Sequence, residues 1–387
     1  MRDQKIKILF ASYGLGVGGI EKCLINLVNS LDLSQYEITV AVLNPEYACR
    51  DELKAGVFVI PFEGNFVNTT DTLTAAKTLS GLQKVSYLLR YAAFRVAVKL
   101  DLDSWNLQKN LPGCYDIAIA YSHTGNVPQY VISKVKAKKK ILWYHTLWGQ
   151  ERNIQCYKQF DRIVTVSDHC KSNFEKMYPQ LSDRIVVLRN LYDYSSIQER
   201  SLDQERLFAT DRLNIATVGR LSEEKGYELA VKTCEQLKNR SAIPFSWYWI
   251  GDGPANKHAR EMIAHLHLED CFFLLGNKSN PYPYMKQSDI YVQPSFSEAY
   301  CTTVIEAKTL KKAIVTSNVE SFREQIRHMI DGVISENDPI RMADSILLLM
   351  TSKALREKLA DNCEENVHSN EETLLRYMAL WEELLSQ

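Results

Sequence analysis

The sequence contains no apolar run of the length that crosses a bilayer, which takes about 18 to 20 residues. Its nine cysteines are an odd number and none occurs in a C-x-x-C pair. They therefore indicate buried thiols in a reducing compartment, not a disulfide framework or a zinc site. An excess of either charge is also absent, because 46 Lys and Arg residues against 47 Asp and Glu residues leave a net charge of −1. The chain as a whole has no attraction to nucleic acid, so any basic binding surface must be local.

The length of 387 residues exceeds that of a typical single domain, and apolar strands alternate with amphipathic helices in both halves. We expect two α/β domains, residues 1–195 and 206–370, joined by a polar linker at residues 195–205. The final helix, within residues 371–387, carries enough apolar side chains to pack back on the first domain. The apolar N-terminal run is short and interrupted by Lys7, so we interpret it as a buried strand and not as a signal peptide.

A glycine-rich loop follows the first predicted strand, Ile6–Ser12. Gly14, Gly16 and Gly19 match G-x-G-x-x-G, the fingerprint of a dinucleotide site. That fingerprint expects an acidic residue after the second strand, where this chain has Asn44. The glycines therefore predict close approach of the backbone to a ligand more strongly than they predict a nicotinamide cofactor.

Two further predicted strands, DIAIAY and KILWY, each run into a histidine. These are His123 and His145. The carboxyl ends of strands in open α/β sheets face the ligand crevice, so both histidines are candidate functional residues. A structural role for each remains equally open.

Basic residues are concentrated in two stretches of the first half. Residues 72–100 contain five basic residues, many apolar ones and no acidic one, which suits either a helix in a membrane interface or an amphipathic helix on the sheet. Residues 134–140 form a shorter basic run, either a solvated loop or a second patch that faces a membrane. The D-x-D pair Asp101 and Asp103 resembles a cation site, but it trails a helix and predicts a surface turn.

Basic residues also bracket the turn after the predicted strand Leu213–Val218. The turn begins with Gly219 and Arg220 and ends with Lys225 and Gly226. Two cations on either side of one turn can hold a diphosphate without a metal ion.

Residues 293–307 (QPSFSEAYCTTVIEA) predict a strand, a short turn and a helix, with Glu298 in the turn just before the helix. Glu306 then lies two turns into that helix, roughly 12 Å from Glu298. With an anion-binding helix N-terminus between them, one carboxylate can bind sugar hydroxyls and the other ribose hydroxyls of a nucleotide-sugar. The alternative is that Glu298 is a helix-start acid and Glu306 a solvated helix residue.

Together these motifs resemble the family 4 retaining glycosyltransferases. The matching segments are Gly18-Gly19-Ile20-Glu21, Gly219-Arg220, Glu224-Lys225-Gly226, Gly251-Asp252-Gly253-Pro254, and Glu298 followed at the E-x7-E spacing by Glu306-Ala307. The resemblance implies the GT-B fold, in which two Rossmann-like domains face each other across a deep cleft. It further implies acceptor binding in the first domain, nucleotide-sugar binding in the second, and no metal or cofactor.

The resemblance also assigns roles to residues. The implied catalytic residues are Glu298, His145, Lys225 and Arg220. The implied donor-binding residues are Gly18, Gly19, Arg220, Lys225, Gly276, Asn277, Glu298, Ala299, Tyr300, Cys301, Thr302 and Glu306. Arg220 and Lys225 are implied to hold the diphosphate, while Glu306 holds the ribose and Glu298 the transferred sugar.

The chain departs from the family pattern at several positions, two of which lie in or beside the implied site. The family often has E-G-F-G where this chain has Glu298-Ala299-Tyr300-Cys301, which adds side chains beside the donor and leaves the sugar undefined. Asp168 replaces the glutamate of a V-S-E motif that includes Ser167.

The sequence therefore predicts a retaining, metal-independent transfer of a hexosyl unit from a nucleoside-diphosphate sugar, with a UDP-sugar favoured, to a glycan acceptor. The basic stretches favour a lipid-linked acceptor at the cytoplasmic face of the plasma membrane, as in bacterial surface polysaccharide synthesis, with an anionic membrane surface as a partner. Three alternatives stay open: a nucleotide-sugar epimerase or phosphorylase of the same fold, a non-catalytic nucleotide-sugar-binding partner of another transferase, and a dinucleotide oxidoreductase.

Overall fold

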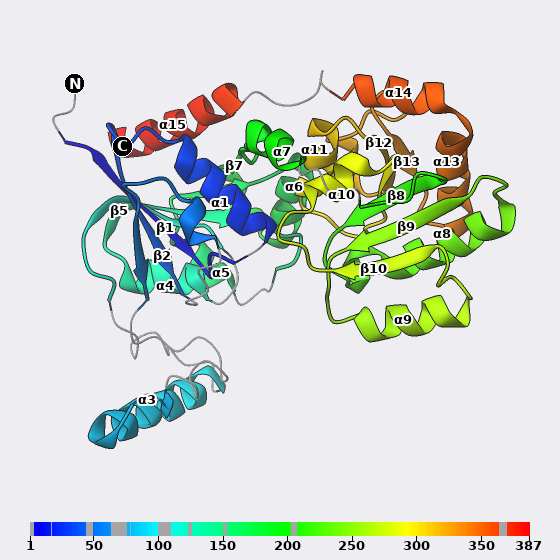
Figure 1. Ribbon diagram of the computed structural model, residues 1–387. Coiled ribbons are helices and arrows are strands. Elements are labelled where there is room, and N and C mark those ends of the chain that lie inside the picture. Colours follow the sequence, from blue (N-terminus) through cyan, green and yellow to red (C-terminus); the bar gives the residue numbers. More distant parts are fainter. Residues whose placement is uncertain are drawn as a thin grey trace. The chain divides into compact units, whose positions relative to one another are not determined.

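A computed structural model describes residues 4–16, 18–43, 49–62, 76–77, 79–99, 110–122, 126–149, 153–202, 207–363 and 370–387 (Figure 1). The chain divides into two compact units. The first comprises Met1–Tyr192 together with Asn370–Gln387, and the second comprises Asp193–Ser369. Each unit is a parallel β-sheet with helices packed on it.

The first unit contains a seven-stranded parallel sheet in the order β3-β2-β1-β4-β5-β6-β7. The strands are β1 Ile6–Ser12, β2 Tyr36–Val42, β3 Phe58–Pro61, β4 Tyr115–Ala120, β5 Ala137–Tyr144, β6 Arg162–Thr165 and β7 Ile185–Val187. Ile8, Leu9 and Phe10 of β1 are all fully buried, although neighbouring side chains point to opposite faces. Both faces of the sheet are therefore covered, as continuous apolar strands of parallel sheets require.

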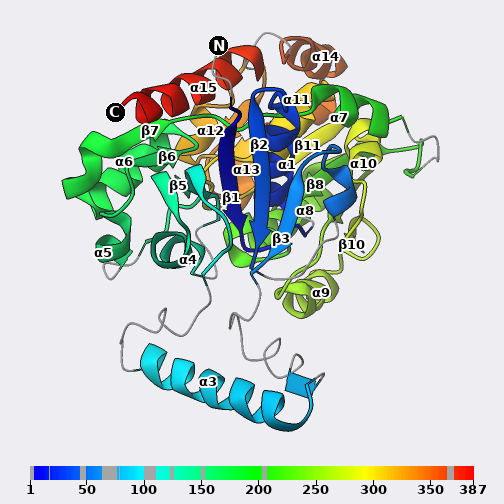
Figure 2. The ribbon, with the colours of Figure 1, turned by 90° about the vertical axis from the view of Figure 1, so that its left-hand side faces the viewer.

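The helices of this unit include α15, from the far end of the sequence. The described helical segments are α1 Gly19–Ser30, η1 Arg50–Glu52, α3 Gly81–Lys99, α4 Val127–Lys134, α5 Ile154–Tyr157, α6 Asp168–Met177, η4 Pro179–Arg184 and α15 Asn370–Ser386. Trp381 of α15 makes edge contacts with the rings of Phe10 and Tyr36, at 6.4 and 5.7 Å between centroids. Tyr377 stacks on Trp143 of β5 at 5.2 Å, so α15, red in Figures 1 and 2, is part of the core of the first unit.

The second unit contains a six-stranded parallel sheet in the order β10-β9-β8-β11-β12-β13. Its strands are β8 Leu213–Val218, β9 Phe245–Ile250, β10 Phe272–Gly276, β11 Ile290–Gln293, β12 Ala313–Ser317 and β13 Val333–Ser335. Its helical segments are α7 Tyr194–Arg200, η5 Glu223–Lys225, α8 Tyr227–Arg240, α9 Asn256–His265, α10 Tyr282–Gln287, α11 Thr302–Thr309, α12 Glu320–Arg323, α13 Pro339–Thr351 and α14 Lys353–Asp361.

Two separate apolar clusters cover the two faces of this second sheet. On one face, Trp247 and Trp249 of β9 are fully buried with apolar residues of α8, α9 and α13. On the other, Tyr291 of β11 is buried with apolar residues of α7, α10 and α11. Because alternate residues of one strand enter different clusters, the sheet is the middle layer of a three-layer α/β unit.

The α/β fold class predicted from the sequence is confirmed. β1 and β8 have the predicted bounds, while β3 and β13 were not predicted because strands this short leave little apolar pattern.

The stretch predicted as a polar linker instead begins with helix α7. The side chain of Asp193 caps α7 by accepting a hydrogen bond from the Ser196 amide at 2.9 Å. Ile197 of this helix is buried in the second unit. The Asp193 cap and the burial of Ile197 therefore stabilise a helix here, although the composition of the segment is polar.

Residues 137–140 of the basic run form the start of β5 and not a loop. Two of its lysines have partners within the first unit. Lys138 forms an ion pair with Asp116 at 2.7 Å, and Lys140 donates to the Ile132 carbonyl at 2.8 Å.

The longer basic stretch contributes α3, which is helical as both of its interpretations require. None of the helices in the described part of the chain combines the length and hydropathy needed to cross a bilayer. Asn44, Asp101, Asp103 and His123 lie outside the described residues.

Candidate functional site

The predicted donor residues of the second unit gather at the carboxyl edge of its sheet. Three neighbouring strands end there in glycine turns, and backbone bonds join them: Gly219 donates to Ile250 at 3.0 Å and Gly251 donates to Gly276 at 2.9 Å. Asn277 accepts from the Asp252 amide at 2.9 Å. Gly276 and Asn277 therefore share this edge with the turn that carries Arg220.

The turn after β8 also contacts the loop after β11. Gly226 has a positive φ of 73°, and a side-chain carbon added there would lie 1.9 Å from the Pro294 carbonyl oxygen. The Phe296 amide donates to the Glu224 carbonyl at 2.8 Å. Only glycine permits this close approach, which brings together two motifs that are far apart in the sequence.

Lys225 and Glu298 form an ion pair at the junction of these two loops. The Lys225 Nζ atom lies 2.8 and 2.9 Å from the two carboxylate oxygens of Glu298. Burial acts to lower the pKa of Lys225, but Glu298, together with Cys301 and Glu224, outweighs it, so the pKa is raised above its ordinary value. Lys225 is therefore fully charged at neutral pH.

A chain of hydrogen bonds holds the Glu298 carboxylate in place. Ser295 donates to it at 2.7 Å, and Gln293 donates to Ser295 at 2.9 Å. Tyr291 and Thr303 both donate to Gln293, at 2.6 and 3.0 Å. Glu298 itself is only 7% exposed. A buried carboxylate with this many partners is fixed in orientation, as a sugar-binding residue must be.

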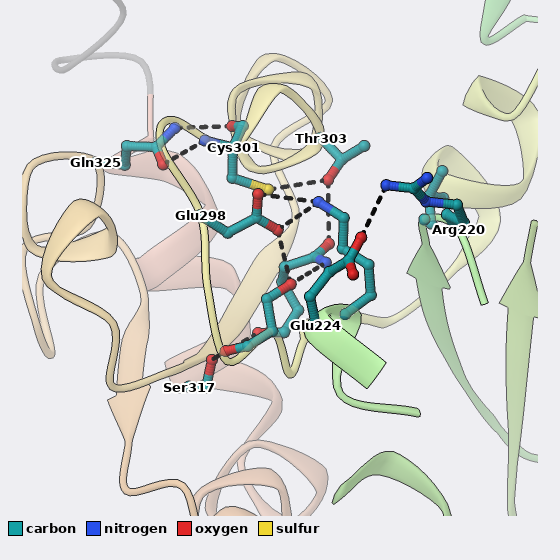
Figure 3. Close-up of polar contacts among 12 residues, drawn as sticks. Arg220, Glu224, Glu298, Cys301, Thr303, Ser317 and Gln325 are labelled. Carbon is teal, nitrogen blue, oxygen red and sulfur yellow. Dashed lines mark hydrogen bonds and ion pairs between the residues drawn. The ribbon is translucent and has the colours of Figure 1, made fainter. Parts of the chain in front are cut away.

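Arg220 lies in a more open environment than Lys225. Its guanidinium donates to Glu224 at 2.8 Å, and its side chain is 65% exposed (Figure 3). An exposed pair of this kind contributes about 0 to 1 kcal/mol, so Arg220 can exchange Glu224 for a phosphate at little cost. Both predicted cations thus have a carboxylate partner within the second unit.

Glu298 lies before the helix, as predicted, but the helix begins only at Thr302, so Glu306 is about one turn into it and not two. Glu298 to Cys301 form a loop, and Gln325 fixes its end by accepting from the Cys301 amide at 3.1 Å and donating to the Cys301 carbonyl at 2.8 Å (Figure 3). The amides of the first turn of α11 consequently follow Cys301. Burial, with Glu298 nearby, raises the pKa of the Cys301 thiol to about 12.

Glu306 is buried on α11, at 4% exposure, and accepts a hydrogen bond from the Tyr282 hydroxyl at 3.1 Å. The alternative in which Glu306 is a solvated helix residue is therefore wrong. Glu298 lies before the helix, so its interpretation as a helix-start acid is also wrong. The sequence analysis gave no role to five residues that make these contacts, namely Glu224, Gln293, Ser295, Thr303 and Gln325.

In the first unit, Gly18 and His145 also lie at the carboxyl edge of their sheet. Gly18 precedes α1 and its carbonyl accepts from the Lys22 amide at 3.0 Å. A side-chain carbon at Gly18 would lie 2.2 Å from a carboxylate oxygen of Glu21. His145 directly follows β5, with its ring 4.8 Å from that of Tyr121.

The helix that follows the V-S-E-like motif contacts the backbone on both sides of His145. The Ser167 hydroxyl caps α6 by accepting from the Cys170 amide at 2.9 Å. The Cys170 thiol in turn donates toward the carbonyls of Tyr144 and Thr146, on either side of His145, at 3.4 and 3.3 Å. Asp168 pairs with Arg189 at 2.8 Å, so the change from glutamate keeps a structural partner.

The two sheets and their loops define the chain as a protein of the GT-B fold. The Anabaena protein HepE, crystallised with UDP and glucose, superimposes with a TM-score of 0.72 over 99% of this chain and 100% of its own, at 16% identity. The Staphylococcus aureus protein TarM superimposes with a TM-score of 0.71 over 97% of this chain and 99% of its own, at 12% identity.

Residues 198–366 match the family described as glycosyl transferases group 1. The family recognised from the sequence is thereby confirmed, and the second unit of the chain is the domain that carries it.

Named relatives come from several organisms. An uncharacterised glycosyltransferase of Methanocaldococcus jannaschii is 26% identical over 44% of this chain and 43% of its own length. The GPI3 subunit of a Saccharomyces cerevisiae phosphatidylinositol N-acetylglucosaminyltransferase is 26% identical over 54% of this chain and 48% of its own. The chain thus spans about half the length of these two relatives. A Campylobacter jejuni N-acetylgalactosaminyltransferase, named for a diphospho-undecaprenol-linked acceptor, is 22% identical over 82% of both chains.

Proposed function

We propose that the protein is a retaining glycosyltransferase that moves a hexosyl unit from a UDP-sugar to a glycan acceptor. The observation that carries this proposal is the convergence of Arg220, Lys225, Glu298 and Glu306 on one edge of the second sheet. The two cations match the diphosphate of such a donor. The Glu298 carboxylate matches its sugar, and the buried Glu306 carboxylate matches its ribose.

In the proposed reaction, the bond between the anomeric carbon and the diphosphate oxygen breaks while the acceptor oxygen bonds to the same carbon from the same face. The acceptor hydroxyl proton passes to the leaving diphosphate. Negative charge builds on that diphosphate, and Arg220, Lys225 and the amides of the first turn of α11 stabilise it. Glu298 orients the sugar and forms no covalent bond, and His145 has the role near the sugar that the family resemblance implies.

The choice of a UDP-sugar is supported by the solved proteins of this fold. HepE was crystallised with UDP and with UDP-glucose. A pneumococcal O-GlcNAc transferase was crystallised with UDP and GlcNAc. In this chain Ala299, Tyr300 and Cys301 follow the sugar-orienting Glu298, so the size of these side chains selects the sugar. A panel of nucleotide-sugars tests this, because the bound donor raises the melting temperature and the others do not.

The acceptor is proposed to be a lipid-linked glycan of a surface polysaccharide or glycoconjugate. The diphospho-undecaprenol acceptor in the name of the Campylobacter relative supports this, as do the basic apolar residues of α3. The enzyme would then work in the cytoplasm, peripherally at the inner face of the plasma membrane.

Replacing the charged pair tests the proposed activity. We expect Lys225→Ala and Glu298→Ala each to lower kcat/KM for transfer by about 100-fold or more, since each removes a group that holds the reacting donor. Transfer from labelled UDP-sugars to a mixture of glycan acceptors is the measurement. Lys257→Ala, on α9 of the same unit and 90% exposed, is the matched control and should keep full activity.

A single variant leaves one charge buried without its partner and destabilises the unit. The double variant Lys225→Met with Glu298→Gln removes both charges, so it should regain thermal stability while transfer stays lost. Full transfer activity in any variant of Lys225 or Glu298 would refute the assignment. Product formed from donor alone, without acceptor, would instead identify an epimerase.

A further inference from the structure

Helix α3 carries an apolar stripe along one face. Leu82, Val85, Leu89 and Val96 are 89%, 55%, 67% and 56% exposed. Their spacing of three, four and seven residues brings all four onto the same side of an α-helix. Figure 2 shows α3 as one uninterrupted helix, and its 19 residues give it a length of roughly 28 Å. Exposed apolar side chains that line up on one side of a helix are typical of a binding surface, whereas isolated exposed apolar residues are common on any protein.

The charge of the helix selects the kind of partner. The sequence from Gly81 to Lys99 contains four basic residues, Lys84, Arg90, Arg95 and Lys99, and no acidic one. A second copy of α3 facing the first would therefore bring eight cations together without a carboxylate from either helix, which is unfavourable. A surface of anionic lipid headgroups supplies the opposite charge, and the acyl layer beneath it accepts the apolar stripe.

We infer that α3 binds an anionic lipid surface, with the Leu82 to Val96 stripe against the acyl boundary and the basic residues at the headgroups. The inference rests on the proposed function in one respect, because a helix of this kind would hold the enzyme where a lipid-linked acceptor is found. The lipid contact itself requires no nucleotide-sugar and no turnover.

Co-sedimentation of the full chain with vesicles tests the inference. We expect binding to vesicles of phosphatidylcholine with phosphatidylglycerol, and little binding to phosphatidylcholine alone. Binding should weaken as the NaCl concentration rises, because salt screens charges at a surface. The double variant Leu82→Gln with Leu89→Gln should bind the anionic vesicles at least tenfold more weakly. Glutamine is a good helix former, so this variant keeps the helix while it removes the stripe.

The matched control is Leu375→Gln, which changes a leucine of α15 that is 64% exposed in the same unit. It should bind vesicles as the unchanged protein does. Equal binding to neutral vesicles, or full binding by the Leu82 and Leu89 variant, would overturn the inference. A dimer seen by light scattering that this variant converts to a monomer would assign the stripe to a second copy instead. Transfer to a water-soluble acceptor should be unchanged in the variant, so a failure of vesicle binding and a failure of the proposed activity remain separate results.

Discussion

At the scale of single residues, the Lys225–Glu298 pair is the central feature of the candidate site. It joins side chains 73 residues apart, with two short bonds to a carboxylate that Ser295 also holds. In the proposed function, a donor diphosphate would draw Lys225 partly away from this carboxylate. The strength of the pair would then set how tightly the diphosphate has to bind before Glu298 can accept hydrogen bonds from the sugar.

The thiol of Cys301 should be unreactive although it lies within the candidate site. Its pKa is raised from 9.0 to about 12 by burial, so at pH 8 the thiolate is about a thousandfold rarer than for an ordinary cysteine. Mass mapping after brief treatment of the native chain with iodoacetamide should show label on the exposed Cys114 and none on Cys301. Urea should make Cys301 reactive. Rapid labelling of Cys301 in the native chain would contradict the burial described for it.

At the scale of elements, close contact between loops decides which residues meet. Gly226 is the strongest case, since it touches Pro294 of another loop and has a left-handed backbone. Gly276 has a similar φ of 69°, but a side-chain carbon there would meet nothing within 4 Å. Substitution of Gly276 therefore measures the cost of the backbone conformation alone, and substitution of Gly226 measures that cost together with a steric clash.

We expect Gly276→Ala to lower the free energy of unfolding by about 1 kcal/mol, the conformational cost alone. Gly226→Ala should lower it by more than about 2 kcal/mol, because the loops must also move apart. Urea unfolding followed by circular dichroism measures both. Equal effects of the two substitutions would mean that the contact with Pro294 is not needed for stability.

Local patterns predicted most elements, and failed where tertiary contacts set the boundary. β8 and β9 follow from apolar runs that end in glycine turns. The start of α11 could not be found, because Gln325, 24 residues further along the chain, fixes the Cys301 peptide. The candidate residues Arg220, Lys225, Glu298 and Glu306 were found from their motifs. Their partners could not be predicted in the same way, because contacts between distant loops are not visible in any short stretch of sequence.

At the scale of the whole molecule, the first unit is completed by the last helix of the chain. Trp381 is fully buried there and contacts Phe10 and Tyr36. We expect Trp381→Ala to destabilise the first unit by about 3 to 5 kcal/mol, the usual cost of removing a large buried aromatic side chain. Leu375→Ala, on an exposed part of the same helix, should change stability by less than about 0.5 kcal/mol.

Scanning calorimetry can measure this difference, with the donor-induced shift in melting temperature as a report on the second unit. The Trp381→Ala variant should keep that shift, because the predicted donor residues Arg220, Lys225 and Glu298 belong to the other unit. Loss of the shift together with the first transition would show that the two units unfold as one.

The position of α15 also determines the order in which the protein can form on the ribosome. The sheet of the first unit is synthesised early, but the side chains of Trp381 and Tyr377 that cover part of it emerge only after the whole second unit. The second unit can therefore reach its native state first. Until α15 has been synthesised, the first unit exposes an apolar surface that a chaperone would recognise.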